Sequence, residues 1–139
     1  MNKKGRVCHI TTIHPSKDVR IFHKECVSLA DQGYEVTLLV GNGEDDKYLG
    51  VSIKGVRRNY SGRAQRLLRV GKALYKAAIA QNADVYHFHD PEFLRFAVRL
   101  SNRTGAKVVY DAHEDVPRQL LDKYYLPKWF SRSISGLVE

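Results

Sequence analysis

The sequence predicts an α/β fold, with a parallel β-sheet that carries helices on both faces. Strand-like and helix-like segments alternate along the chain, an order typical of parallel strands joined by right-handed crossovers. The 139 residues suit one ordinary domain and are too few for two α/β lobes. A content of 43% hydrophobic and 27% charged residues is typical of a globular protein. We therefore treat residues 1–139 as a single domain.

Five segments are predicted to be strands because each is short and rich in apolar, β-branched or aromatic residues. The first is closed by a polar segment that contains Pro15, and the second is followed by Gly41 and Gly43. The five segments are Arg6 to Thr11, Tyr34 to Val40, Val51 to Val56, Asp84 to His89, and Lys107 to Ala112.

Apolar residues at spacings of three and four predict helices between these strands. The first helix has Asp18 as its candidate N-cap and ends near Gly33. The second, from Arg63 to Gln81, combines an apolar stripe with a cationic face, and the third lies between Pro91 and Arg103. Two further short helices are expected from Arg118 to Glu139, and the last is apolar enough to need a covering surface.

The amino terminus and the cysteines bear on the cellular compartment. Cys8 and Cys26 are predicted to be free buried thiols, because they are far apart and form no CxxC pair. The charged residues from Met1 to Arg6 precede an apolar run that is too short for a signal peptide or a membrane span. We therefore expect a cytoplasmic protein.

Positive charge is concentrated in one part of the chain, which has a formal net charge of +8. From Lys54 to Lys76 there are eight cations and no acidic residue, which indicates an anionic partner or surface. Nucleic acid is not expected, because only Tyr60 and Tyr75 are interleaved with these cations as stacking platforms. Anionic lipid headgroups and plain solvent exposure both stay open as explanations.

Candidate reactive side chains follow three of the predicted strands, at the point where each strand ends. In a parallel sheet these ends lie at one edge, where ligands bind. The sequence therefore predicts a polar site at this edge. The residues are His14, Asp18 and Arg20 after the first strand, His89, Asp90 and Glu92 after the fourth, and Asp111, His113, Glu114 and Asp115 after the fifth.

Some nearby residues are assigned structural roles. His87 is interpreted as a core histidine whose hydrogen bonds are satisfied. Lys24 and Glu25 are expected either to lie on the solvated face of the first helix or to pair along it, and no chemistry is assigned to them. Asp18 and Arg20 are expected either to pair with each other, which would fix their loop, or to contact the substrate.

Several common chemistries lack their sequence motifs. The first strand is followed by Thr12 to Lys17 rather than by GxGxxG, so a bound dinucleotide is not expected. Neither the phosphate-binding motif GxxxxGK[ST] nor the serine motif GxSxG is present. The histidines at the predicted edge have neither HExxH nor paired Cys/His spacing. We therefore predict no metal and no other cofactor.

Three segments carry a resemblance to a known family. They are HPSKDVRIFHKECVSLADQGYEVTLLV from His14 to Val40, DVYHFHDPE from Asp84 to Glu92, and KVVYDAHEDVP from Lys107 to Pro117. With D-x-R-x-x-H-K-E, H-D-P and D-x-H-E in this order, the chain resembles the amino-terminal domain of retaining GT-B-fold glycosyltransferases, the glycosyl transferases group 1 (family 4). The resemblance spans Arg6 to Pro117 and implies a Rossmann-like lobe.

The resemblance also implies a division of labour between two lobes. This lobe would bind the sugar acceptor, a glycan or lipid-linked molecule. A carboxy-terminal lobe outside these 139 residues would bind the nucleotide-sugar donor, and the sugar would be transferred with retention. The chain alone is then expected to be inactive. Peripheral contact with an anionic membrane would suit a lipid-linked acceptor.

The same resemblance implies roles for single residues. His113 takes the place of a family histidine that lies beside the donor sugar, so it is the expected catalytic residue. Where many members have a glycine pair near the donor phosphates, this chain has Ser16 and Lys17. Glu114 either binds substrate or caps the following helix. The expected substrate-binding residues are His14, Lys17, Asp18, Arg20, His89, Asp90 and Glu114.

Two other functions stay open. One is a non-enzymatic Rossmann-like binding module, which would need a finished boundary in place of the apolar segment from Trp129 to Val138. The other is a domain that binds polyanions or membrane surfaces through the basic stretch from Lys54 to Lys76.

Overall fold

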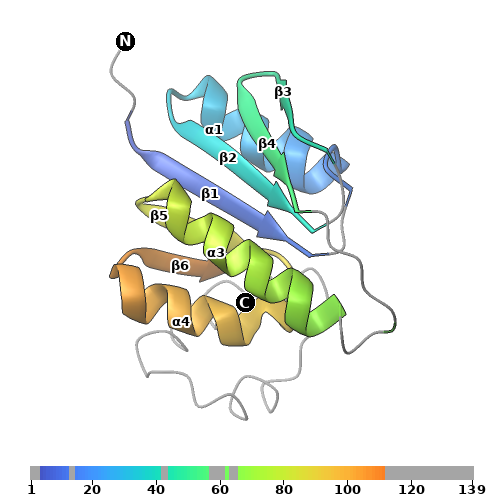
Figure 1. Ribbon diagram of the computed structural model, residues 1–139. Coiled ribbons are helices and arrows are strands. Elements are labelled where there is room, and N and C mark those ends of the chain that lie inside the picture. Colours follow the sequence, from blue (N-terminus) through green and yellow to red (C-terminus); the bar gives the residue numbers. More distant parts are fainter. Residues whose placement is uncertain (1–3, 13–14, 42–43, 57–61, 63–65, 112–139) are drawn as a thin grey trace.

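The computed structural model describes residues 4–12, 15–41, 44–56, 62 and 66–111, which form one six-stranded sheet with helices on both faces (Figure 1). The strand order is β3-β4-β2-β1-β5-β6, and every neighbouring pair is parallel except β3 and β4. The strands are β1 (Arg6–Thr11), β2 (Glu35–Val40), β3 (Asp46–Tyr48), β4 (Val51–Gly55), β5 (Val85–Phe88) and β6 (Lys107–Tyr110).

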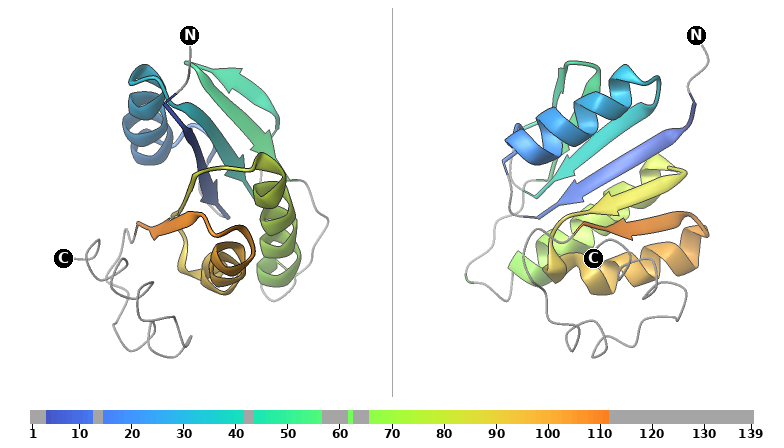
Figure 2. Two further views of the ribbon diagram at one scale, coloured as in Figure 1. Left: turned by 90° about the vertical axis from the view of Figure 1, so that its left-hand side faces the viewer. Right: turned by 180° about the vertical axis from the view of Figure 1, so that it is seen from behind.

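Helices cover the two faces of the sheet separately. Figure 2 shows η1 and α1 on one face, and α3 and α4 together on the other. The helical segments are the π-helix η1 (Val19–Cys26) and its continuation α1 (Val27–Asp31), the π-helix η2 (Arg66–Val70) and its continuation α3 (Gly71–Gln81), and the 3-10 turn η3 (Pro91–Phe93) and its continuation α4 (Leu94–Thr104).

The core is divided by the sheet into two apolar clusters. The α3/α4 side takes alternate residues of β1 and β5, such as Ile10 and Phe88, against helix residues such as Leu74 and Leu100. The η1 side packs buried helix residues against β2 and β4. That second cluster consists of Ile21, Phe22, Cys26, Val36, Leu38, Val40, Val51 and Ile53.

The predicted fold class is confirmed. All five predicted strands are present, with ends that differ by at most two residues. The sequence did not predict the antiparallel edge strand β3, because its three residues are all exposed and form no apolar run. The helices expected from Arg118 to Glu139 lie outside the described residues.

The basic helix matches its sequence pattern where it is described. Val70 and Leu74 are buried, whereas Arg69, Lys72 and Lys76 are exposed. This confirms the apolar stripe and cationic face. Within the described ranges, no helix is long and apolar enough to cross a bilayer.

Both cysteines are buried free thiols, as predicted. Burial raises the pKa of Cys8 and of Cys26 well above the ordinary range, so neither carries an appreciable thiolate at neutral pH.

Strand order marks one place in the sheet as the natural position for a ligand. β1 pairs with β2 on one side and with β5 on the other. The chain leaves β1 through η1 on one face and enters β5 from α3 on the opposite face (Figure 2). The strand order therefore reverses between β1 and β5, and ligands of such sheets bind beyond the carboxyl ends of the strands at this switch point.

Candidate functional site

A buried carboxylate joins the ends of the two strands at the switch point. Asp90, which follows β5, accepts hydrogen bonds from the Thr11 hydroxyl and from the Thr12 backbone N–H, both at 2.7 Å. The Thr12 hydroxyl donates to Glu92. On the other side of Thr12, a Cβ at Gly41 would lie 2.5 Å from the Thr12 carbonyl oxygen, so only glycine allows this approach. The start of the loop after β1 is therefore held from two sides.

The first helix is anchored by its N-cap. The Asp18 carboxylate accepts from the backbone N–H groups of Arg20 and Ile21, at 3.0 and 2.9 Å. These bonds satisfy donors that a helix start leaves unpaired. The expected side-chain pair between Asp18 and Arg20 is wrong, because the Arg20 guanidinium instead binds the Asp111 carboxylate at 3.2 Å. Arg20 thus links the first helix to the end of β6.

Lys17 does not join this group. Its ammonium pairs with Asp46 of β3 at 3.2 Å and lies 4.6 Å from the centre of the Tyr48 ring. In the sheet, β3 is separated from β5 by β4, β2 and β1. Exposed pairs of this kind contribute little to stability, and their ammonium stays accessible to solvent.

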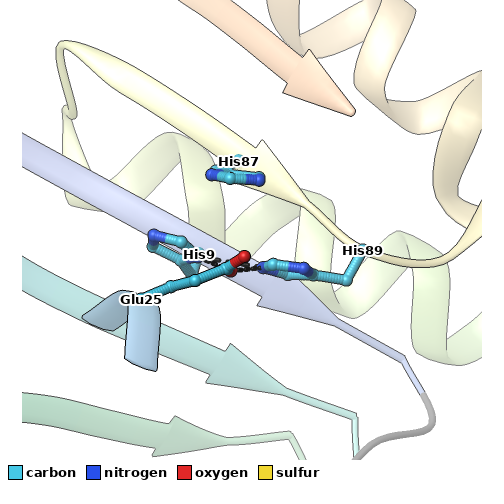
Figure 3. Close-up of side chains that lie close together, drawn as sticks. All are labelled: His9, Glu25, His87 and His89. Atoms are coloured by element: carbon cyan, nitrogen blue, oxygen red, sulfur yellow. Dashed lines mark hydrogen bonds and ion pairs between the residues drawn. The ribbon is translucent and has the colours of Figure 1, made fainter. Parts of the chain in front are cut away.

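Three histidines and a glutamate gather on the η1 face of β1 and β5 (Figure 3). His9 Nδ1 and His89 Nε2 share a hydrogen bond of 2.9 Å. Glu25 points from η1 to the same place, with its Oε2 3.5 Å from His89 Nε2 and 3.9 Å from His9 Nδ1. The His87 ring stacks on both other rings, with centroid distances of 4.5 Å to His9 and 4.7 Å to His89. We call these four residues the histidine cluster.

Burial changes the protonation of this cluster. It lowers the pKa of His9 to about 3, and the neighbouring His87 acts in the same direction while Asp111 opposes it. It also raises the pKa of Glu25 to about 8, assisted by a hydrogen bond to Asp111 and by the charge of that carboxylate. At neutral pH His9 is therefore neutral and Glu25 largely retains its proton.

Polar atoms in the cluster lack hydrogen-bond partners. His9 Nε2, His87 Nε2 and Glu25 Oε2 are all buried without a hydrogen bond, although His87 Nε2 lies 3.7 Å from the Asp111 carboxylate and Glu25 Oε2 lies 3.5 Å from His89 Nε2. An unsatisfied buried polar atom typically costs about 1–3 kcal/mol. Buried polar atoms without hydrogen bonds are typical of functional sites.

Two interpretations of the sequence are corrected here. His87 is not a satisfied core histidine, because its Nε2 has no hydrogen-bond partner. Glu25 is not on the solvated face of the helix, since its side chain is only 22% exposed and points at the sheet. Both residues belong to the histidine cluster.

The sequence also missed His9, although the pattern contained a sign of it. His9 is one of two histidines that parallel pairing sets side by side, because it is the register partner of His87. Glu25 follows Ile21 by four residues, a spacing that places both on one side of a helix. His9 has no recognisable motif around it, and Glu25 ends the first-helix motif that carried the resemblance, so only the pairing of β1 with β5 and the packing of η1 bring the two together.

The predicted site residues are only partly brought together. His89 and Asp90 are buried at the switch point, and Arg20 reaches the same end of the sheet through Asp111. Lys17 lies at the β3 edge. His14, His113 and Glu114 lie outside the described residues.

Comparison with protein-family models decides the family. The model of Glycosyltransferase Family 4 matches residues 19–138. The chain belongs to glycosyltransferase family 4. A search among curated proteins found no match. The match includes Glu25, His89 and Asp111 of the site, whereas β1 with His9 precedes it. The resemblance noted in the sequence is thereby confirmed, and the sheet is the Rossmann-like amino-terminal domain of a GT-B glycosyltransferase.

Proposed function

We propose that this chain is the acceptor-side lobe of a retaining glycosyltransferase, which transfers a sugar from a nucleotide-sugar donor to a glycan or lipid-linked acceptor. The family match over residues 19–138 is the observation that carries this proposal. A donor-binding lobe completes the active site, on the same polypeptide or on a partner.

The switch point gives the proposed acceptor a place to bind. Thr11, Thr12 and Asp90 meet there in a network with defined distances, so the loop after β1 starts from a rigid base. These three residues are buried and bonded to one another, so they position the loop rather than contact the sugar themselves. We propose that Asp90 organises the polar rim formed by the ends of β1 and β5, and that His14 contacts the acceptor.

Transfer from a diphosphate leaving group needs positive or N–H donors near the departing phosphates. Arg20 is half-exposed beside the same end of the sheet, with its guanidinium oriented by Asp111. We propose that Arg20 faces the donor phosphates, that His113 lies beside the donor sugar, and that Glu114 binds substrate. Lys17 lies at the β3 edge beside Asp46 and Tyr48, so we propose that it attracts the donor phosphates only at long range, through its positive charge.

The basic helix fits an acceptor carried by lipid. Arg69, Lys72 and Lys76 are exposed along η2 and α3, and Lys54 is exposed on β4. Clustered cations of this kind attract anionic headgroups, at about 1 kcal/mol for each charge near the surface. We therefore propose a cytoplasmic enzyme that contacts the membrane peripherally.

A transfer assay with radiolabelled nucleotide sugars tests the proposal. The chain is assayed alone and together with a donor-binding lobe, with lipid-linked and free glycans as acceptors. We expect transfer only when both lobes are present, and weak nucleotide-sugar affinity by calorimetry for the chain alone. Tight binding of a nucleotide sugar to the isolated chain, or no transfer by the combined lobes to any acceptor, would refute this division of roles.

A further inference from the structure

The histidine cluster has the dimensions of a metal site. Three of its atoms form a triangle. His9 Nδ1 and His89 Nε2 are 2.9 Å apart, and Glu25 Oε2 lies 3.5 Å from His89 Nε2 and 3.9 Å from His9 Nδ1. Ligands at about 2.0–2.2 Å from a tetrahedral zinc ion are about 3.3–3.5 Å from each other. One ligand atom from each of the four residues, His87 included, fits within 4.8 Å of all the others. The His87 ring is stacked on the other two, so it would have to turn for one of its nitrogens to face an ion bound at the triangle.

We propose that His9, Glu25, His87 and His89 bind a divalent transition-metal ion, for which Zn²⁺ has the matching donor set. Imidazole nitrogens together with one carboxylate favour zinc and its neighbours over Ca²⁺ and Mg²⁺, which prefer oxygen ligands. The cluster adjoins the proposed sugar site, because Asp111 lies beside both His89 and Arg20, but binding of the ion can be measured without sugar transfer.

The unpaired atoms of the cluster support this assignment. Glu25 Oε2 is part of the triangle and has no hydrogen-bond partner, and His87 Nε2 has none either. The imidazoles of His9 and His89 are completely buried, so water from bulk solvent does not reach them. A metal ion would satisfy several buried atoms at once, which hydrogen bonds within the cluster do not achieve.

The surroundings of the cluster resemble the outer shell of a metal site. His89 directs Nε2 toward the triangle and places Nδ1 3.8 Å from Asp111 Oδ2. Metal-binding histidines usually donate a hydrogen bond from their second nitrogen to a carboxylate, and Asp111 lies on that side of His89, although beyond hydrogen-bond distance. Asp111 is itself held by Arg20. The partial exposure of Glu25 and His87, at 22% and 20% of their side chains, leaves a route for the ion.

The sequence predicted no metal because the four ligands come from three different elements. His9 is on β1, Glu25 is on η1, and the other two histidines are on or directly after β5. An ion bound there would tie the first helix to both strands at the switch point. Since the unfolded chain has no such assembled site, binding should raise stability.

Zinc binding to the purified chain, stripped with a chelator, tests the proposal. We expect one Zn²⁺ per chain at this site by calorimetry, a higher melting temperature, and a tetrahedral Co²⁺ absorption spectrum. Long-range ¹H–¹⁵N spectra of the imidazoles should shift for His9, His87 and His89. His23, which is exposed on η1, should be unaffected.

Matched variants separate this cluster from other histidines. Glu25→Gln and His89→Gln, each checked for folding by circular dichroism, should weaken zinc affinity by about tenfold or more. His23→Ala should leave it unchanged. Equal zinc affinity in wild type and both cluster variants, or imidazole signals of the wild type that do not respond to zinc, would overturn the proposal. A sugar-transfer failure would leave these results unaffected, so the two proposals fail separately.

Discussion

The two faces of β1 and β5 bury opposite chemistry on the same backbone. Toward α3 and α4, these strands present Ile10, Phe88 and other apolar residues that pack in a continuous cluster. Toward η1, the intervening positions present His9 and His87, whose Nε2 atoms are both unpaired. The apolar face explains why the sheet folds. The imidazole face leaves polar atoms without hydrogen bonds, so its residues are better explained by function.

The largest expected effect comes from the apolar face. Phe88 is fully buried and stacks on Tyr110, with ring centroids 4.7 Å apart. Phe88→Ala should lower the free energy of unfolding by about 3–5 kcal/mol, because it removes buried apolar area and leaves a cavity. Urea denaturation measures this loss. Leu68→Ala is the control, since that side chain is 53% exposed and should change stability by less than about 0.5 kcal/mol.

An intermediate effect on stability is expected at the switch point, where Asp90 holds the start of the loop after β1. Asp90→Ala leaves the Thr11 hydroxyl and the Thr12 N–H without their acceptor, at a cost of about 1–3 kcal/mol. Asp90→Asn keeps one acceptor oxygen and should cost less. The same urea series compares the two variants. If Asp90→Ala were as stable as wild type, the rim would not be held by this carboxylate.

The imidazole face should tolerate replacement far better than the apolar face does. In metal-free protein, His9→Leu/His89→Leu removes both partners of the buried hydrogen bond and substitutes apolar side chains of similar volume. Such exchanges are nearly neutral, so we expect a change of less than about 1 kcal/mol in the free energy of unfolding. A loss as large as that of Phe88→Ala would show that the histidines are part of the structural core.

The smallest effect is expected at the β3 edge. Hydrogen bonds from Lys17 and from the Lys47 backbone lower the pKa of the exposed Asp46 carboxyl. Because that pKa is lowered in the folded state, the pair stabilises the folded protein above the unfolded-state pKa of Asp46. This stabilisation is lost as the pH falls through the folded-state pKa. Lys17→Met should raise the Asp46 pKa toward the ordinary aspartate range, as measured by NMR titration. An unchanged pKa would mean that Lys17 does not bind Asp46 in solution.

The fold could be predicted from the sequence because the spacing of apolar residues indicates which side of each strand or helix is buried. Runs such as Glu35–Val40 and the stripe of Val70, Leu74 and Ala78 each define one element and its buried face. The edge strand Asp46–Tyr48 was missed because it has no buried residue.

The candidate site was predicted less well, since it depends on which strands are neighbours. Residues that end a strand, such as His89 and Asp90, were found from the rule for parallel sheets. His9 lies inside a strand and Glu25 inside a helix, so their meeting follows only from strand order and helix placement. The partners of Arg20 and Lys17 depend equally on tertiary contacts between distant segments.

The turnover of His113→Ala in the combined two-lobed enzyme tests the proposed role of this lobe most directly. We expect sugar transfer to fall by about a hundredfold or more, with the free energy of unfolding unchanged and His23→Ala as active as wild type. Transfer by His113→Ala at the wild-type rate would contradict the assignment of this lobe's polar rim to catalysis.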